Sequence, residues 1–229
     1  MNTVPFIDIH THLSRQEWDI VTVRNIYPGE AIPAFTGKDF FSVGLHPWKI
    51  NFRDENNDSL VMMEDALEFD HVIFVGECGL DKRTETDFDE QMRVFEAQAI
   101  MAEEYKKPLI IHCVKAYNEI IEMHKKVHPS VPWIFHAYTG NPEISKQLVK
   151  RNIFFSFGKI LFKDNAKAID SFLNLPLSKI YFETDEGEWD IRKIYKRGAE
   201  LKELPIEELK QSVWKNFNLI ENVSVNFSI

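Results

Sequence analysis

Residues 71–112, HVIFVGECGLDKRTETDFDEQMRVFEAQAIMAEEYKKPLIIH, contain the pattern that predicts the fold. An apolar run over His71 to Val75 precedes a long helical pattern over Asp87 to Tyr105, and a second apolar run covers Pro108 to Ile111. Strand, helix and strand in this order predict two parallel strands joined by a crossover helix. The runs are apolar at nearly every position, as strands covered on both faces require.

Similar apolar runs extend outward from this unit in both directions. The eight expected strands are Val4 to Ile9, Asp19 to Val23, Phe40 to Gly44, His71 to Val75, Pro108 to Ile111, Val131 to Phe135, Ile153 to Phe157 and Lys179 to Phe182. The expected helices are Asp87 to Tyr105, Ala116 to Val127, Pro142 to Lys150, Asn165 to Leu173 and a closing helix over Leu204 to Glu221. The early strands are too close together for full helices, and residues 24–39 are rich in proline and glycine. We therefore expect one α/β domain over residues 1–229, a distorted (β/α)₈ TIM-type barrel with the first helices shortened or missing.

The composition is that of an ordinary globular protein, with 44% hydrophobic and 28% charged residues in 229. No apolar run approaches the roughly 20 residues of a membrane span, and MNTVPFIDIH lacks the pattern of a signal peptide. Two cysteines without a C-x-x-C spacing argue against a disulfide framework or a thiolate zinc site. These features predict a cytoplasmic protein, with a monomer as the default. A net charge of −9 argues against a broad basic surface for duplex DNA, so an anionic substrate needs a local cationic site.

Ligand-type residues stand where the apolar runs end. The chain reads PFIDIHTH, FFSVGLH, VIFVGE, PLIIH, PWIFH and IYFETD, and each segment ends in His, Glu or Asp. The carboxyl ends of parallel barrel strands lie on one face, where active sites form. Residues far apart in sequence are therefore expected to meet there. They are His10, His12, Glu77, His112, His136 and Asp185.

This set predicts a centre for one or two divalent metal ions, zinc, manganese or magnesium. A single histidine at a strand end is more often an ordinary core or surface residue, but six coincidences favour ligation. His10 and His12 project to the same side of an extended strand. Glu77 offers two oxygens and can bridge two ions, and Asp185 can ligate one ion and act as general base for a metal-activated water, so we assign both carboxylates catalytic roles. His46 follows its strand on a loop, which favours substrate contact over ligation.

The residues resemble those of the TatD family of metal-dependent hydrolases, within the amidohydrolase group. The resemblance runs from Ile7 to Asn218 and includes IDIHTHL, VGLHPW, GECGLD, PLIIH, FHAYTG, FFSFG, YFETD and WKNFN, in order. It implies a barrel enzyme in which the six residues bind metal, Glu77 bridges and Asp185 doubles as the base. It also implies phosphodiester hydrolysis, typically as a deoxyribonuclease, with DNA or another phosphodiester as the substrate.

The chain departs from the family pattern in three places. Val114 stands where the family commonly has an arginine, and Lys115 can replace it only as a point charge. Glu186 and Glu188 add carboxylates after the last aspartate, and the region from Leu13 to Phe40 is short. Several cations follow strand ends and can either line a groove for an anionic substrate or be solvated surface residues. They are Lys49, Lys82, Arg83, Lys115, Lys159 and Lys163.

Two aromatic residues beside the expected ligands, Trp48 and Tyr138, can stack on a base or pack in the core. His46, Lys115 and Tyr138 are the residues that we expect to contact substrate.

Three functions agree with these features. The first is a TatD-like deoxyribonuclease or phosphodiesterase. The second is an amidohydrolase-type enzyme acting on a small amide, ester or phosphoester, which Glu186 and Glu188 favour because they repel a phosphate chain. The third is a non-catalytic metal-binding protein.

Overall fold

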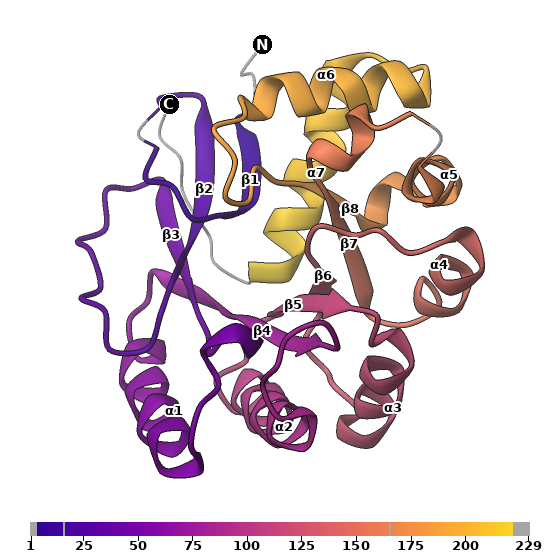
Figure 1. Cartoon of the computed structure of the whole chain (residues 1–229). Helices are drawn as coiled ribbons and strands as arrows, with labels where there is room; N and C mark the ends of the chain where they lie inside the picture. Colours follow the sequence, from indigo (N-terminus) through magenta and orange to yellow (C-terminus); the bar gives the residue numbers. More distant parts are fainter. Residues whose placement is uncertain (1–3, 16, 165, 222–229) are drawn as a thin grey trace.

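Eight parallel strands form one sheet in sequential order, β1 to β8, that curls into a nearly closed barrel (Figure 1). The computed structural model describes residues 4–15, 17–164 and 166–221. The strands are β1 (Phe6–Thr11), β2 (Ile20–Ile26), β3 (Asp39–Val43), β4 (Val72–Asp81), β5 (Leu109–Val114), β6 (Trp133–Phe135), β7 (Ile153–Phe157) and β8 (Ile180–Phe182). The expected α/β barrel is therefore confirmed.

Helices occupy the connections between successive strands from β3 onward, whereas loops join β1 to β2 and β2 to β3 on the left side of Figure 1. The helices are α1 (Arg53–Leu67), α2 (Phe88–Glu104), α3 (Tyr117–Val127), α4 (Pro142–Leu148), α5 (Lys167–Asn174), α6 (Ile191–Lys202) and α7 (Ile206–Glu221). Three short 3₁₀ helices are η1 (Pro47–Lys49), η2 (Lys159–Phe162) and η3 (Leu177–Lys179). Among the described residues, neither the β1–β2 nor the β2–β3 connection contains a helix, as the short spacing predicts.

The sequence patterns predicted most elements but missed two helices. Neither α1 nor α6 was among the expected helices. Asn165, the expected first residue of helix α5, lies outside the described residues. The local signals that begin α2 and α4 are clear in the structure, because the side chains of Asp87 and Asn141 accept hydrogen bonds from the backbone N–H of Glu90 and Ile144.

Strand β4 is longer than predicted and passes through the site. It continues beyond Val75 to Asp81, and all of its residues are buried. Glu77 therefore lies inside the strand and not at its end. The pairing with β5 shifts between Val75 and Cys78, next to Glu77. Such an irregularity re-aims side chains, and it lies where the carboxylate must turn toward the barrel face.

The first and last strands meet at the site. The backbone N–H of Asp185 donates to the carbonyl of His10 at 3.0 Å, and the N–H of His12 donates to the carbonyl of Asp185 at 3.1 Å. Thr11 and Asp185 form the parallel bridge that joins the two edges. Closure of the barrel and positioning of three ligand candidates therefore depend on the same backbone contacts.

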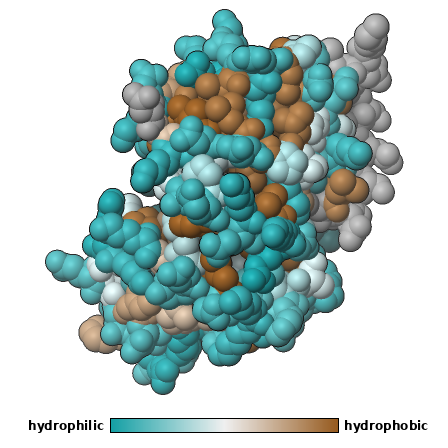
Figure 2. Space-filling view, turned by 90° about the vertical axis from the view of Figure 1, so that its right-hand side faces the viewer, coloured by the Kyte–Doolittle hydropathy of each residue, from teal (hydrophilic) through white to brown (hydrophobic). Residues whose placement is uncertain are grey.

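The face of the barrel that carries α3 to α5 is largely polar. Figure 2, which shows the side of the barrel where α3 to α5 lie, is covered mostly by hydrophilic side chains, with apolar ones in separate areas. No helix in the part of the chain that the structure describes combines the length and apolar composition needed to cross a bilayer. The apolar strand residues are instead buried between the barrel interior and the surrounding helices.

Candidate metal centre

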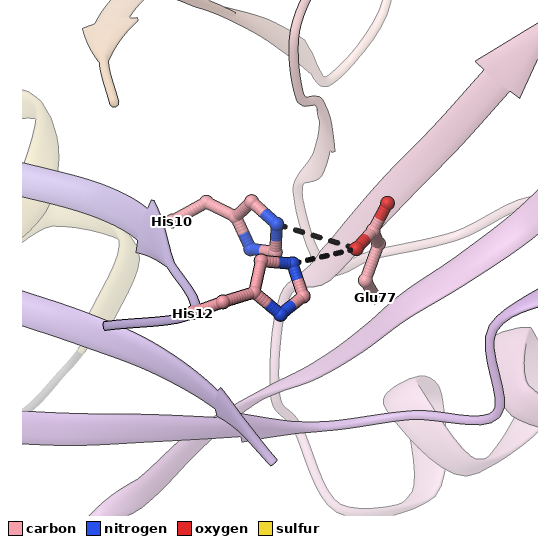
Figure 3. Close-up of side chains that lie close together, drawn as sticks. All are labelled: His10, His12 and Glu77. Atoms are coloured by element: carbon pink, nitrogen blue, oxygen red, sulfur yellow. Dashed lines mark ion pairs between the residues drawn. The ribbon is translucent and has the colours of Figure 1, made fainter. Parts of the chain in front are cut away.

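His10 and His12 approach the same carboxylate oxygen from β1. Their Nε2 atoms lie 3.3 and 3.4 Å from Oε2 of Glu77 (Figure 3). His10 is fully buried at the end of the strand, and the His12 side chain is 18% exposed. Because alternate residues of an extended segment point to one side, both imidazoles reach the barrel mouth together.

The other oxygen of Glu77 faces a second group of imidazoles. Oε1 lies 2.7 Å from Nε2 of His136, 2.8 Å from Nδ1 of His112 and 3.3 Å from Nε2 of His46. Glu77 thus stands between two sets of nitrogen ligands, with one oxygen for each set. This is the arrangement in which a carboxylate can bridge two ions.

Asp185 completes the set from the segment after β8. Its Oδ1 lies 3.9 Å from Nε2 of His10 and 3.8 Å from Nε2 of His12, and its side chain is 26% exposed. The backbone of Asp185 is left-handed, with φ 55°. A carboxylate that faces both the histidines and solvent can contact a ligated ion and an attacking water.

All six residues expected to bind metal lie together on this face of the barrel. Nitrogen and carboxylate atoms within 4.8 Å of one another form three groups, which are His10–His12–Glu77, His10–His136–Asp185 and His46–Glu77–His112. His46, expected to contact substrate, instead lies in the third group and is 6% exposed. Its Nδ1 accepts the backbone N–H of Trp48 at 3.1 Å, which leaves Nε2 directed at Glu77.

A buried nitrogen without a partner agrees with a divalent ion at this donor set. Nε2 of His10, which faces Oε2 of Glu77, is buried without a hydrogen-bond partner among the described residues. A buried polar group without a partner is costly, and coordination of an ion removes that cost. Imidazole and carboxylate ligands together suit zinc and manganese.

The charges at the centre are strongly coupled. Burial alone would raise the pKa of Glu77, but His136 and the neighbouring imidazoles of His10 and His112 hold it well below its usual range. Burial opposes the protonation of His136, yet Glu77 and Glu183 raise its pKa well above its ordinary value. Without an ion, a proton on the imidazoles therefore balances the charge of the Glu77 carboxylate.

Two residues that the sequence patterns did not single out position the ligands. Oδ1 of Asn25, on β2, accepts the backbone N–H of Glu77 at 2.6 Å. Oδ2 of Asp81, at the end of β4, lies 3.3 Å from Nε2 of His112 and accepts the indole N–H of Trp48 at 2.7 Å. A carboxylate behind a ligating histidine fixes its ring and tautomer. Asp81 also stands at a strand end, so the rule that found the six ligands could have found it.

Glu183 and Asp8 support the site from β8 and β1. Oε1 of Glu183 accepts the backbone N–H of Ala137 at 2.6 Å and lies 3.5 Å from Nδ1 of His136. Asp8 accepts the N–H and the hydroxyl of Thr184 at 3.0 and 2.6 Å, and burial raises its pKa to about 7. Both carboxylates are fully buried, and both precede predicted ligands by two residues on the same strand segments. This spacing of two residues from a predicted ligand was a sequence signal that could have located Asp8 and Glu183.

The predicted substrate contact of Tyr138 does not fit the structure. Tyr138 is 1% exposed, and its hydroxyl is hydrogen-bonded to Oγ of Ser145 at 2.9 Å. Its ring packs edge-on against Phe155, with centroids 4.7 Å apart. Tyr138 is therefore a core residue. Trp48, 59% exposed, is the aromatic side chain that faces solvent beside the ligands.

A small cavity opens onto the ligands. This central cavity has a volume of about 100 Å³ and is lined by His12, Tyr27, His46, Trp48, Lys49, Glu77, His112, His136, Asp185 and Glu186. Lys115, the third expected substrate contact, does not line it but lines a neighbouring cavity of about 390 Å³ that also contains His112 and Asp185.

A comparison with known protein families matches most of the chain. The model of the family described as TatD related DNase matches residues 29–222. The chain belongs to this family. The TatD resemblance seen in the sequence motifs is thereby confirmed, and the chain is a TatD family metal-dependent hydrolase.

Relatives of this TatD family member cover most of its length. The uncharacterized metal-dependent hydrolase YabD of Bacillus subtilis is 26% identical over 246 residues, which cover 91% of this chain and 96% of YabD. A putative deoxyribonuclease TATDN1 homolog of Vairimorpha ceranae is 27% identical over 210 residues, covering 82% and 75%. The crystal structure of the TatD homolog YjjV of Escherichia coli has a TM-score of 0.80 at 19% identity, covering 95% and 98%, and shows the same fold.

Proposed function

We propose that this TatD family member is a phosphodiesterase that cleaves DNA or another polynucleotide, with one or two divalent ions, zinc, manganese or magnesium. One observation carries the proposal. Asp185 faces His10 and His12 on one side and lines the cavities around the centre on the other. A carboxylate in that position can receive a proton from a water that attacks a bound phosphodiester.

Each side chain has a distinct role in this proposal. His10, His12 and Asp185 would hold one ion, and His112 and His136 would hold a second, with Glu77 between the two sets of nitrogens. Bound divalent ions supply Lewis acidity and lower the pKa of a coordinated water. Asp185 orients the attacking water and accepts its proton. Asp81 and Glu183 hold the rings of His112 and His136 in place.

The name of one relative agrees with this substrate. The TATDN1 homolog of Vairimorpha ceranae is named a putative deoxyribonuclease. Two exposed cations on the same barrel face, Lys115 and Lys159, are suited to a substrate with negative charge. Their contribution is local, because the net charge of the chain is −9.

The test is release of labelled nucleotides from single-stranded DNA by metal-stripped protein. Magnesium, manganese and zinc are restored in turn, with Asp185→Asn as the control variant. We expect cleavage only with metal and only with Asp185 present. Full activity of Asp185→Asn contradicts the role of the base, and no cleavage by metal-loaded wild type contradicts the polynucleotide substrate.

A small-molecule hydrolase is the second candidate, favoured by the size and charge of the central cavity. Its volume is about 100 Å³, and Glu186 contributes a carboxylate to its wall. Glu186→Gln separates the two candidates. It should increase the rate on DNA if a phosphate chain passes this wall, whereas hydrolysis of small esters without any DNA cleavage supports the second candidate. Stoichiometric metal with neither activity supports a non-catalytic protein.

A further inference from the structure

Four cations line cavities on the face of the barrel that carries the ligands. They are Arg83, Lys115, Lys159 and Lys163, which are all exposed. None of their side chains forms an ion pair within the described part of the chain. Lys82, beside Arg83, differs because Glu119 neutralises it. Unpaired cations that share a concave surface attract anions more strongly than cations paired with carboxylates.

The first two cations share the cavity next to His112. This β5 cavity has a volume of about 390 Å³ and is lined by Arg83, His112, Cys113, Val114, Lys115, Tyr117, His136, Ala137, Thr139 and Asp185. Arg83 comes from the segment after β4, and Lys115 from the segment after β5. The only carboxylate among the lining residues is Asp185, which faces the ligands. The outer wall of the β5 cavity is therefore positive.

The second two cations line another cavity, which also includes Asp185 in its wall. This β7 cavity has a volume of about 370 Å³ and is lined by Ala137, Thr139, Gly158, Lys159, Ile160, Lys163, Glu183, Thr184 and Asp185. Glu183 is already engaged, because its Oε1 accepts the N–H of Ala137 and lies beside His136. Lys159 and Lys163 are therefore the unpaired cations of the β7 cavity, and Asp185 is its remaining carboxylate.

The two cavities adjoin each other at the proposed catalytic base. Ala137, Thr139 and Asp185 line both of them. His112 and His136 further connect the β5 cavity with the central cavity. A chain that runs from one cavity to the other therefore passes Asp185 and the ligands midway. Each side of that midpoint carries two cations.

We propose that the β5 and β7 cavities form one anion-binding track for an extended single-stranded phosphodiester chain. Arg83 and Lys115 hold a phosphate on one side of the cleaved bond, and Lys159 and Lys163 hold a phosphate on the other side. The proposal rests on the proposed function, and it adds the residues and the minimum substrate length. A guanidinium with an ammonium on one side, and two ammonium groups on the other side, suit phosphate oxygens. A compact monoester engages only one end of the track.

Binding of labelled oligothymidylates tests the track independently of cleavage. The probes are fluorescein-labelled dT2 and dT8, with fluorescence anisotropy at several salt concentrations. The protein carries Asp185→Asn and is loaded with manganese, and a denaturing gel verifies that the probe stays intact. Two double variants in this background remove each end of the track, Arg83→Ala with Lys115→Ala and Lys159→Ala with Lys163→Ala.

A third double variant provides the matched control. Lys125→Ala with Lys126→Ala removes the same net charge from α3, where these lysines pair with Glu122 and Glu96. We expect each track variant to weaken dT8 binding at least tenfold relative to this control. The salt slope should fall by about 0.7, since each pair of cations holds one phosphate and each single-strand phosphate contact contributes about 0.7. The loss for dT2 should be smaller, because dT2 cannot engage both ends.

Three results overturn the track. They are dT8 affinity equal to the control in both track variants, an effect at one end alone, and no binding of dT8 by the parent. The proposed function is judged separately by wild-type cleavage. Binding that depends on both ends, without cleavage, keeps the track and contradicts hydrolysis. Cleavage with no effect of either pair keeps the hydrolase and contradicts the track.

Discussion

The backbone N–H of Asp185 donates to the carbonyl of His10 at 3.0 Å, and this bond joins the last strand segment to the first. The two side chains then approach each other, with Oδ1 of Asp185 3.9 Å from Nε2 of His10. The two residues come from nearly opposite ends of the chain. The proposed base is therefore positioned by the contact that closes the barrel.

The left-handed backbone of Asp185 makes its substitutions differ in stability. At φ 55°, asparagine is tolerated and a β-branched residue is not. We expect Asp185→Asn to keep its thermal midpoint within about 2 °C, and Asp185→Val to lose about 1 to 3 kcal/mol from backbone strain. Calorimetry on both metal-free variants measures the difference. Equal stability of the two variants would show that the backbone conformation at this residue is unimportant.

Asp81 should control metal affinity through His112. Its Oδ2 lies 3.3 Å from Nε2 of His112, so Asp81→Asn weakens the hold on that ring. Loss of such a partner typically costs 10 to 100-fold in metal affinity. Competition with a chromophoric chelator measures the affinity. Trp48→Phe is the control, because it removes the other hydrogen bond to this oxygen and leaves the contact with His112. An affinity unchanged in Asp81→Asn contradicts the positioning role.

Gly44 should be irreplaceable because β3 and β4 approach closely there. A Cβ on Gly44 would lie 2.5 Å from Cα of Gly76 and 2.6 Å from the carbonyl oxygen of Glu77. Backbone cannot move aside as a flexible side chain can. We expect Gly44→Ala to destabilise the protein by about 1 to 3 kcal/mol and to lower metal affinity, since Glu77 must shift.

Gly37→Ala is the control for the expected shift of Glu77 in Gly44→Ala. A Cβ on Gly37 meets no atom within 4 Å, although φ is +95°. Its cost should be about 1 kcal/mol of backbone strain, without any change in metal affinity. Chemical denaturation and metal titration on both variants separate the two effects. Equal metal affinity of Gly44→Ala and wild type would contradict the proposed displacement of Glu77.

His124 lies on α3, away from the metal centre, and should make the stability of the folded protein depend on pH. It is 8% exposed, its Nε2 has no partner among the described residues, and its ring packs on Trp133. Burial, with a smaller effect of Arg151, lowers its pKa to about 4 from 6.5. His124 binds a proton more readily in the unfolded chain than in the folded protein. Its contribution to the free energy of unfolding is therefore complete above pH 6.5 and is lost as the pH falls toward 4.

The expected loss from His124 between pH 7 and pH 5 is about 1 to 2 kcal/mol. His124→Gln, which does not titrate, should remove that part of the pH dependence. Urea denaturation of both proteins at the two pH values measures it. An identical pH dependence in the two proteins would show that His124 is not the cause.

The strand pattern and the ligand set could be predicted because each depends on local sequence. A strand buried on both faces must be apolar throughout, so VIFVGE and PLIIH indicate strands without knowledge of their neighbours. A polar residue at the end of such a run is conspicuous. The helices α1 and α6 were harder to predict because their surfaces are mostly polar and exposed.

The parallel barrel, the short connections near its start and the six residues that meet at its mouth could be predicted from local sequence. The folded chain was needed to show that Tyr138 is buried, that His46 faces Glu77, and that Asn25, Asp81 and Glu183 hold the ligands. It also decided that Arg83 and Lys115 share one cavity. The physical reason is that apolar periodicity records whether a residue is covered, whereas the partner of a polar atom depends on which strand lies beside it after the barrel closes.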